Sequence, residues 1–288
     1  MIKIKVPATS ANLGPGFDVL GVAFSMYNMF GFERSDHYEM VDFQGRYSNP
    51  HHNLVCSSYK KVFDALNMNA YPVKIYMLDQ EVPTSRGLGS SATCIVAGVL
   101  AAKYFLGDKI SYDECFQIAT SIEGHPDNVA PAMFGGLIAS YKACDTYKSV
   151  KYDVSKDIKF NLLVPNFELQ TSKARSVLPK ELSYADITHN ASRVANIPYA
   201  FFKGDLEMIK DLLDDKAHEP YRMPLIKDSM EIKELAHKKG YAFAISGAGP
   251  TLLVVSKDDI KDTFDKFSDF TVYKLSVAHD GAIVEEEK

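Results

Sequence analysis

A glycine- and serine-rich loop at residues 83–92, with the sequence PTSRGLGSSA, most constrains what this chain can fold into. It joins an extended apolar segment, 73–78, to a long helical pattern that begins near Gly89. Glycines let the backbone approach a ligand closely, and the first N–H groups of a helix are unpaired donors with partial positive charge. The loop therefore fits a phosphate site, but it also fits an ordinary turn with a serine cap.

The loop does not follow the two best-known phosphate-binding patterns. No Gly-Lys-Ser/Thr sequence follows it, which excludes a Walker P-loop. Gly87, Gly89 and Ala92 match the pattern G-x-G-x-x-A, and Asp108 lies about 20 residues further on. Asp108, however, comes just after the same predicted helix and not at the end of a following strand. We therefore reject a dinucleotide-binding (Rossmann) fold.

Composition and charge exclude several classes of function. The chain has 288 residues, of which 46% are hydrophobic and 24% charged, as in a globular protein. Its net charge of -5 argues against a nucleic-acid partner. The four cysteines are widely spaced without a CxxC pair, the N-terminal residues alternate like a strand, and no apolar run approaches membrane-spanning length. We expect a cytoplasmic protein that binds neither nucleic acid nor membrane.

The apolar patterns predict strands and helices in mixed order. Helices are expected at 53–66, 89–106, 111–124, 172–178, 187–203, 206–214, 229–240 and 258–267. Strands are expected at 2–6, 19–27, 38–43, 73–78, 135–140, 160–164, 241–245, 252–256 and 271–277. Ser111 with Glu114 predicts a capping box, and Ser229 predicts a helix cap. Because a regular βαβ alternation is absent, the pattern predicts an α+β fold, and the polar, turn-like segment 143–157 divides it into domains 1–150 and 151–288.

Glu123 is the first residue that indicates a metal. It ends the predicted helix 111–124, where the helix dipole disfavours a carboxylate. A lone exposed glutamate would be the simpler explanation. A bound cation would remove the penalty, and Mg²⁺ beside a nucleotide takes one or two carboxylates together with phosphate oxygens. Glu123 and the Ser91 hydroxyl are therefore candidate Mg²⁺ ligands, whereas His125 is expected only to form hydrogen bonds within its loop.

Three loops together carry a resemblance to a known family. Residues 7–18, 83–92 and 246–251 resemble the three signature motifs of the GHMP small-molecule kinases, in the usual order. The sequence NLGPGFD at 12–18 is similar to the branch that phosphorylates L-homoserine, and further matches lie at 124–131, 171–179, 219–222 and 280–282. The resemblance covers essentially the whole chain. It implies a GHMP kinase fold, with an N-terminal domain like ribosomal protein S5 domain 2, a ferredoxin-like C-terminal domain and an active site between them.

The resemblance also implies roles for single residues. The ATP phosphates would lie at Pro83, Arg86, Gly87, Leu88, Gly89, Ser90 and Ser91, with Ser91 and Glu123 on Mg²⁺ and Asn53 at the adenine or its ribose. L-Homoserine would be held by Asn12, Asp18, Asn128, Thr171, Arg175 and Arg222. Two arginines suit a carboxylate because the guanidinium binds it in a forked geometry. Asp18 suits the ammonium or the hydroxyl group. On composition alone, these charges would be assigned to the surface.

The implied activity is ATP-dependent phosphorylation of the terminal hydroxyl of L-homoserine, a step of threonine biosynthesis. Asn128 stands where other members of the superfamily carry an aspartate base, so direct attack without a strong base is expected, with Asn12, Asp18 and Asn128 as catalytic residues. The family also suggests a homodimer. Gln80 departs from the family, which often has lysine there, so the affinity for ATP could be altered. Two alternatives stay open: a GHMP kinase for another small alcohol, such as shikimate or a mevalonate derivative, and a catalytically inactive metabolite sensor.

Overall fold

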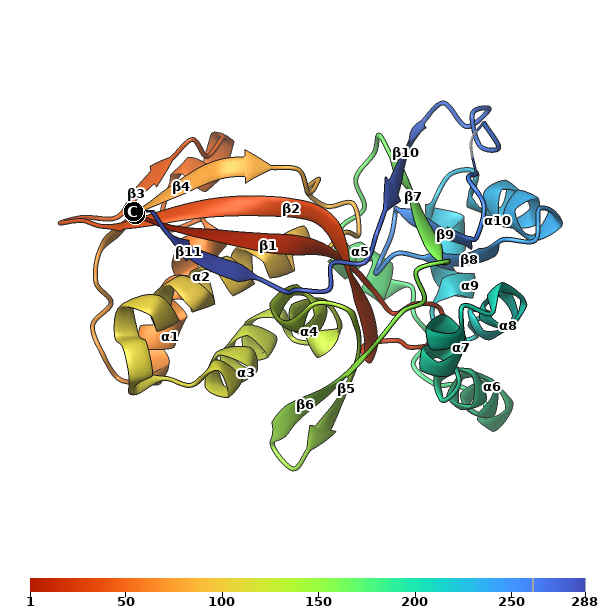
Figure 1. Cartoon of the computed structure of the whole chain (residues 1–288), viewed down its shortest axis with the longest axis horizontal. Helices are drawn as coiled ribbons and strands as arrows, with labels where there is room; N and C mark the ends of the chain where they lie inside the picture. The colour runs from red at the N-terminus through yellow and green to blue at the C-terminus, as the bar shows by residue number, and fades with distance from the viewer. Residues whose placement is uncertain (261, 288) are drawn as a thin grey trace.

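The computed structural model describes residues 1–260 and 262–287, which form two sheets with separate helical layers (Figure 1). The first sheet contains β1 (Ile2–Ala11), β2 (Leu20–Arg34), β3 (Glu39–Val41), β4 (Val73–Gln80), β5 (Leu137–Ala143), β6 (Thr146–Tyr152) and β11 (Ile283–Glu286). Its order is β11-β1-β2-β4-β3, while β5 pairs with the first residues of β2 and with β6. In this sheet, as far as the described residues show it, β3 and β4 pair in parallel and the other neighbours pair antiparallel.

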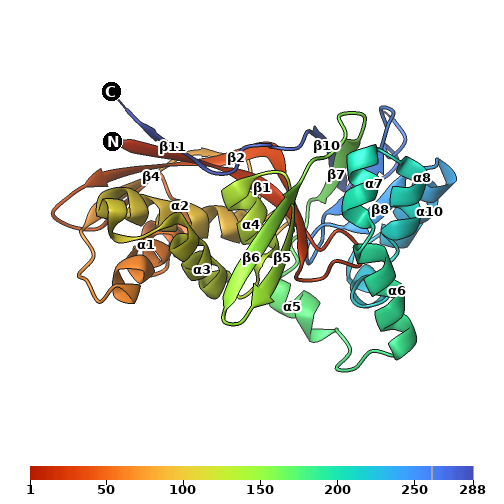
Figure 2. The ribbon, with the colours of Figure 1, turned by 60° about the horizontal axis from the view of Figure 1, so that its bottom comes forward.

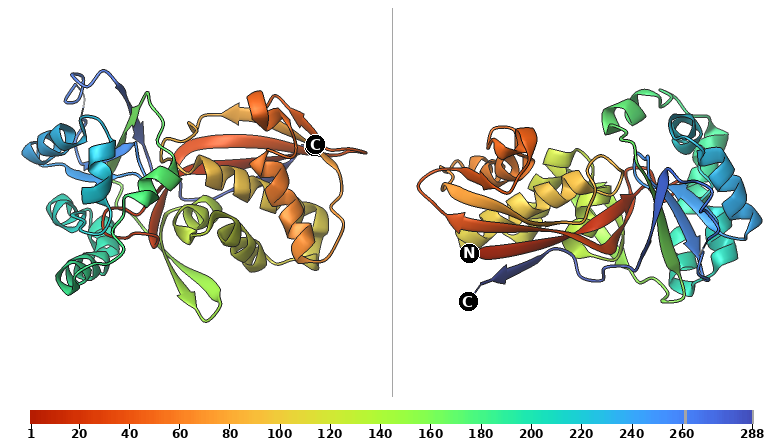
Figure 3. Two further views of the ribbon diagram at one scale, coloured as in Figure 1. Left: turned by 180° about the vertical axis from the view of Figure 1, so that it is seen from behind. Right: turned by 90° about the horizontal axis from the view of Figure 1, so that it is seen from above.

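Four helices cover one face of this sheet (Figure 3). They are α1 (Leu54–Ala65), α2 (Ser90–Leu106), α3 (Tyr112–Glu123) and α4 (Pro126–Phe134). Short 3-10 turns lie at η1 (Gly45–Ser48) and η2 (Gly107–Lys109). The predicted capping box of α3 is confirmed, because the Ser111 side chain and the Glu114 side chain each accept the other's backbone N–H. The apolar faces of β1, β2 and β4 pack against these helices in one continuous core.

Helix α2 is the central helix of that core. By length and composition alone, Ser90–Lys109 could cross a membrane, contrary to the expectation that no apolar run is long enough. Within the protein, however, 61% of this window is buried. A helix that is apolar all round is what the centre of a core requires, so its hydropathy needs no lipid to explain it.

The second sheet contains β7 (Lys159–Pro165), β8 (Ala242–Ile245), β9 (Leu252–Ser256) and β10 (Phe270–Leu275). Its antiparallel order, β10-β7-β9-β8, is that of a ferredoxin-like fold. Between β7 and β8 come α5 (Thr171–Ser176), α6 (Tyr184–Val194), α7 (Ile197–Lys203), α8 (Leu206–Leu212), α9 (Glu219–Arg222), η3 (Met223–Leu225) and α10 (Ser229–Lys238). The structure thus has the predicted α+β architecture.

A second core joins the two halves of the molecule. Ala8 and Val22, near the ends of β1 and β2, pack in one cluster with Phe160 of β7 and Phe201 of α7. Helix α5 lies at the same junction (Figure 2). The two chain termini meet at the opposite end, since β11 pairs with β1 (Figures 2 and 3). The domain boundary near residue 150 stays a prediction, but the last strand of the chain belongs to the first sheet.

Several local predictions were wrong. The segment 143–157 is not turn-like throughout, because β6 forms a hairpin with β5. The expected helix 187–203 is divided into α6 and α7 at Asn196, just before Pro198 in the first turn of α7. The expected helix 258–267 has no helical residue among its described residues, 258–260 and 262–267, where a bend at 258 is followed by turns at 262–266. Asp228, not Ser229, is the N-cap residue of α10, and Ser229 Oγ donates to the Met223 carbonyl instead.

Helix α4, helix α9, the three 3-10 turns and strand β11 were not predicted at all. Helix α4 contains Pro126 at its start and Pro131 within it, and prolines usually indicate a turn. Pro126 is tolerated because the first N–H groups of a helix have no partner in the helix. Strand β11 has only four residues, all exposed, so no hydrophobic pattern marks it.

Candidate active site

One cavity of about 720 Å³ lies where the three glycine-rich loops meet. The loop after β1, the loop before α2 and the loop between β8 and β9 each contribute to its wall. Hydrogen bonds tie these loops together: Thr9 N–H donates to the Leu88 carbonyl at 3.1 Å, and Gly247 N–H to the Ala11 carbonyl at 3.1 Å. Ser246 Oγ donates to the Gly87 carbonyl at 2.7 Å. Motifs far apart in the sequence therefore form a single site.

The loop before α2 needs glycine at two positions for a packing reason. Gly87 and Gly89 have positive φ angles of 77° and 70°. A Cβ at Gly87 would lie 2.4 Å from the Ser246 carbonyl oxygen, and one at Gly89 would lie 1.9 Å from Thr9 Oγ1. Gly89 is also the N-cap of α2 and offers no side-chain cap, so the first N–H groups of this 17-residue helix are left for a ligand. Such a helix start is suited to phosphate.

The two expected metal ligands lie together beside this helix start. Ser91 Oγ donates a hydrogen bond to Glu123 Oε2 at 2.8 Å, and both residues line the cavity. Burial raises the pKa of the Glu123 carboxyl, so a nearby cation would favour its charged form. A hydroxyl and a carboxylate are the hard oxygen ligands that Mg²⁺ takes. The donor set therefore fits the ion.

A second polar group in the cavity was not predicted as such. Atoms of Asp18, His125 and Asp127 that could hold a metal ion all lie within 4.8 Å of one another. His125 Nδ1 is hydrogen-bonded to Asp127 Oδ1, in line with the loop hydrogen bond expected of His125. Burial opposes the charged imidazole, but the hydrogen bond and charge of Asp127 outweigh it and raise the pKa of His125. The buried Asp127 follows His125 by only two residues, and no sequence signal separated it from a surface aspartate.

The charged residues expected at the substrate also meet in the cavity. Arg175 of α5 and Asp18 of the first loop form a forked ion pair, with N–O distances of 2.6 Å and 3.2 Å. Arg222 of α9 is 1% exposed yet lines the same cavity. Phe17 lies against both arginines, with each guanidinium carbon 5.2 Å from its ring centre. Sequence reasoning gave Phe17 no role, although it stands inside the first motif.

The three asparagines are all engaged in hydrogen bonds with the protein. Asn12 donates to the Gly247 carbonyl at 2.8 Å and accepts from Asp18 N–H at 3.0 Å, so it links the first and third loops. Asn128 Oδ1 accepts from Thr9 Oγ1 at 2.7 Å. Asn53 caps α1 through Oδ1 and donates to the Tyr47 carbonyl. Each of them lines the cavity, but each also fixes part of its wall.

The cavity brings together all of the predicted site residues except Pro83 and Leu88. The Leu88 side chain is buried in the core that joins the two halves, and its carbonyl accepts a hydrogen bond from Thr9 N–H near the end of β1. Arg86 lines the cavity, but its guanidinium donates to the carbonyl groups of Pro165 and Asn166 at the end of β7. Thr171 is the first residue of α5, which also carries Arg175.

Family models and curated relatives both match this chain. The family model for the GHMP kinases N terminal domain matches residues 53–136, and the model for the GHMP kinases C terminal domain matches residues 199–270. Homoserine kinase from Clostridium beijerinckii is 41% identical over 277 residues, which are 95% of this chain and 92% of that protein. A homoserine kinase from Clostridium botulinum is 41% identical over 91% of this chain and 88% of its own.

Among solved structures, homoserine kinase from Cytophaga hutchinsonii superposes with a TM-score of 0.86 at 28% identity, over 99% of this chain and 97% of that one. The fold, the three converging loops and these relatives agree with one another. The chain belongs to the homoserine kinases of the GHMP kinase superfamily.

Proposed function

We propose that the protein transfers the γ-phosphoryl group of ATP to the terminal hydroxyl of L-homoserine and releases O-phospho-L-homoserine. The observation that carries this proposal is one cavity that holds both an uncapped helix start with the Ser91–Glu123 pair and the charged set Asp18, Arg175 and Arg222. L-Homoserine has a carboxylate, an ammonium and a hydroxyl group. Two guanidinium groups and one carboxylate match the charges of that zwitterion.

The phosphates of ATP would lie at the start of α2, over residues 87–91, with Ser91 and Glu123 as Mg²⁺ ligands. A bound Mg²⁺ would neutralise the negative charge of the phosphate oxygens during transfer. Pro83 and Leu88 would support this loop through the backbone and the core. Asn53 would shape the nucleoside end of the cavity, because it holds the start of α1 and the Tyr47 carbonyl in place.

The contacts of Asp18 and Asn128 support a reaction without a strong dedicated base. Both oxygens of Asp18 accept hydrogen bonds from Arg175, and Asn128 Oδ1 already accepts one from Thr9. Asn128 can therefore offer its N–H groups to a substrate oxygen, but an amide does not take up a proton. We propose that Asn12, Asp18 and Asn128 orient the hydroxyl for in-line attack and that its proton passes to the phosphate or to solvent.

An assay of ADP release over a panel of small alcohols tests the proposal. We expect turnover with ATP and L-homoserine and none with shikimate or mevalonate. Preference for another alcohol would assign a different GHMP kinase activity, and no turnover with any alcohol would favour a metabolite sensor. In the proposed role the protein would act in the cytoplasm, in threonine biosynthesis. Light scattering tests the homodimer that the family suggests.

A further inference from the structure

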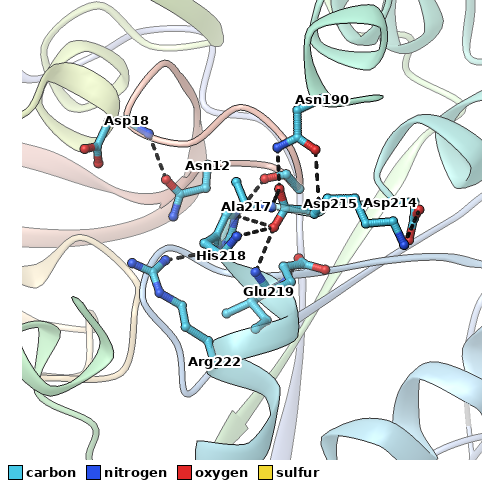
Figure 4. A network of polar contacts seen from close by, with 12 residues as sticks. Asn12, Asp18, Asn190, Asp214, Asp215, Ala217, His218, Glu219 and Arg222 are labelled. Carbon is cyan, nitrogen blue, oxygen red and sulfur yellow. Dashed lines mark hydrogen bonds and ion pairs between the residues drawn. The ribbon is translucent and has the colours of Figure 1, made fainter. Parts of the chain in front are cut away.

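A polar cluster with buried side chains extends from Arg222, which lines the cavity, to His218 and Asp215 (Figure 4). It consists of Asp215 and His218, in the connection between α8 and α9, and Arg222 at the end of α9. The His218 side chain is completely buried and does not line the cavity, whereas Arg222 does. The proposed function uses Arg222 but gives His218 no role.

The hydrogen bonds of His218 determine which of its ring nitrogens carries the proton. Nε2 lies 2.7 Å from the Gly14 carbonyl oxygen, which can only accept, so Nε2 must carry the hydrogen. Nδ1 lies 3.2 Å from Arg222 Nη1, which can only donate, so Nδ1 must be bare. Burial lowers the pKa of His218, in agreement with this neutral form. One imidazole thus joins the first loop to the guanidinium of Arg222.

The same bonds determine how Arg222 is oriented. Its Nε donates to the Ala174 carbonyl at 3.3 Å, and its Nη1 donates both to the Gly247 carbonyl at 3.1 Å and to His218. Among the described residues, 1–260 and 262–287, Nη2 of Arg222 donates no hydrogen bond. Because Arg222 also forms part of the cavity wall, Nη2 is the nitrogen left for a ligand.

The surroundings of Arg222 destabilise its positive charge. Burial, with the nearby positive charge of Arg175, lowers the pKa of Arg222 to about 10. A buried cation of this kind gains most from a ligand that brings negative charge. Asp215 fixes the turn that holds the cluster, since its carboxylate accepts the backbone N–H groups of Ala217, His218 and Glu219.

We propose that His218 is a positioning residue for the carboxylate of the substrate. Its Nδ1 accepts a hydrogen bond from the second Nη1 hydrogen of Arg222, and this contact orients Nη2 toward the cavity. At the same time, His218 fixes the first loop through the Gly14 carbonyl. This inference rests on the proposed function, in which Arg222 binds the carboxylate of L-homoserine.

Two substitutions separate the two bonds of the imidazole. In His218→Gln the side-chain N–H can still reach the Gly14 carbonyl, but the acceptor for Arg222 is lost. In His218→Asn an oxygen replaces Nδ1 as the acceptor, and the bond to Gly14 is lost. His189→Gln is the matched control, because His189 bonds the Asp214 carbonyl at 3.1 Å and does not line the cavity.

We expect His218→Gln to raise the KM for L-homoserine about ten-fold or more, the size of effect of losing one hydrogen bond to a charged group. The KM for ATP should stay within about two-fold, and His189→Gln should leave both KM values nearly unchanged. His218→Asn, which keeps the acceptor for Arg222 but loses the bond to Gly14, should raise the KM for L-homoserine less than His218→Gln does. With homoserine amide, which lacks the carboxylate charge, wild type and His218→Gln should be equally poor. Equal KM values for L-homoserine in all of these proteins would overturn the inference.

A measurement on the wild-type protein tests the contact between His218 and Arg222 even if a variant fails to fold or homoserine is not the substrate. In ¹⁵N NMR spectra His218 should show a protonated Nε2 and a bare Nδ1, and the Nε signal of Arg222 should be sharp. A protonated Nδ1, or a mobile Arg222 beside an intact His218, would refute the positioning role. Absence of turnover with L-homoserine by wild type would instead refute the proposed function.

Discussion

Gly89→Ala tests whether neighbouring segments determine the conformation of the loop before α2. The new Cβ would lie 1.9 Å from Thr9 Oγ1, at a φ of 70° that L-residues rarely adopt. The left-handed conformation costs about 1–2 kcal/mol for a non-glycine residue. Relief of the clash requires Thr9 to move and to break its hydrogen bond with Asn128, which costs about 1 kcal/mol more. We therefore expect a loss of about 2–3 kcal/mol in the free energy of unfolding.

Activity should fall further than stability explains, because the displaced groups are Asn128 and the start of α2. If the same 2–3 kcal/mol is lost from the transition state, kcat/KM falls on the order of 100-fold. Urea unfolding and the ADP-release assay measure the two effects. Gly240→Ala is the matched control: its φ is 77°, but no atom lies within 4 Å of the new Cβ. It should cost only the conformational part and leave activity unchanged.

The double variant Gly89→Ala with Thr9→Ala completes the test. Removal of Oγ1 relieves the closest contact, so the double variant should be more stable than the sum of the two single changes predicts. Equal stability losses in Gly89→Ala and Gly240→Ala, with full activity in both, would refute the reasoning. The glycine would then serve only the local backbone and not the contact between loops.

Three further predictions concern single side chains. Glu123→Gln should reduce kcat at least 100-fold if Glu123 binds Mg²⁺. In Mg²⁺-free buffer at pH 7, the Glu123→Gln variant should also have a higher melting temperature than wild type, because burial raises the pKa of Glu123. The difference in melting temperature should vanish below pH 4.5, the ordinary pKa of a glutamate, where Glu123 is protonated in both the folded and the unfolded state. Burial raises the pKa of Glu219 to about 8. Wild type should therefore lose stability relative to Glu219→Gln as the pH rises from about 4.5 to 8, and the difference should stay constant above pH 8. A difference in melting temperature that does not depend on pH would contradict this prediction. Gln80→Lys should lower the KM for ATP without changing that for L-homoserine, and an unchanged KM for ATP would mean that Gln80 does not affect nucleotide binding.

Much of the fold could be predicted because its signals are local. The capping box at Ser111 and the apolar run of α2 are signals carried by residues close together in the sequence, and both are present in the structure. Helix α4 and strand β11 were missed because their stability comes from partners distant in sequence. Strand β11 exists because it pairs with β1, from the other end of the chain. Strand β6 was also missed, because its polar sequence gives no clear hydrophobic pattern and it forms by pairing with β5.

The sequence by itself identified most of the predicted residues that meet in the cavity, since the three glycine-rich motifs and the two arginines can be recognised without coordinates. It could not show how they are used. Only the tertiary structure places Leu88 in the core, pairs Asp18 with Arg175 and sets the buried His218 behind Arg222. The physical reason is that these contacts join segments up to about two hundred residues apart, whose meeting depends on the packing of two sheets through one shared core.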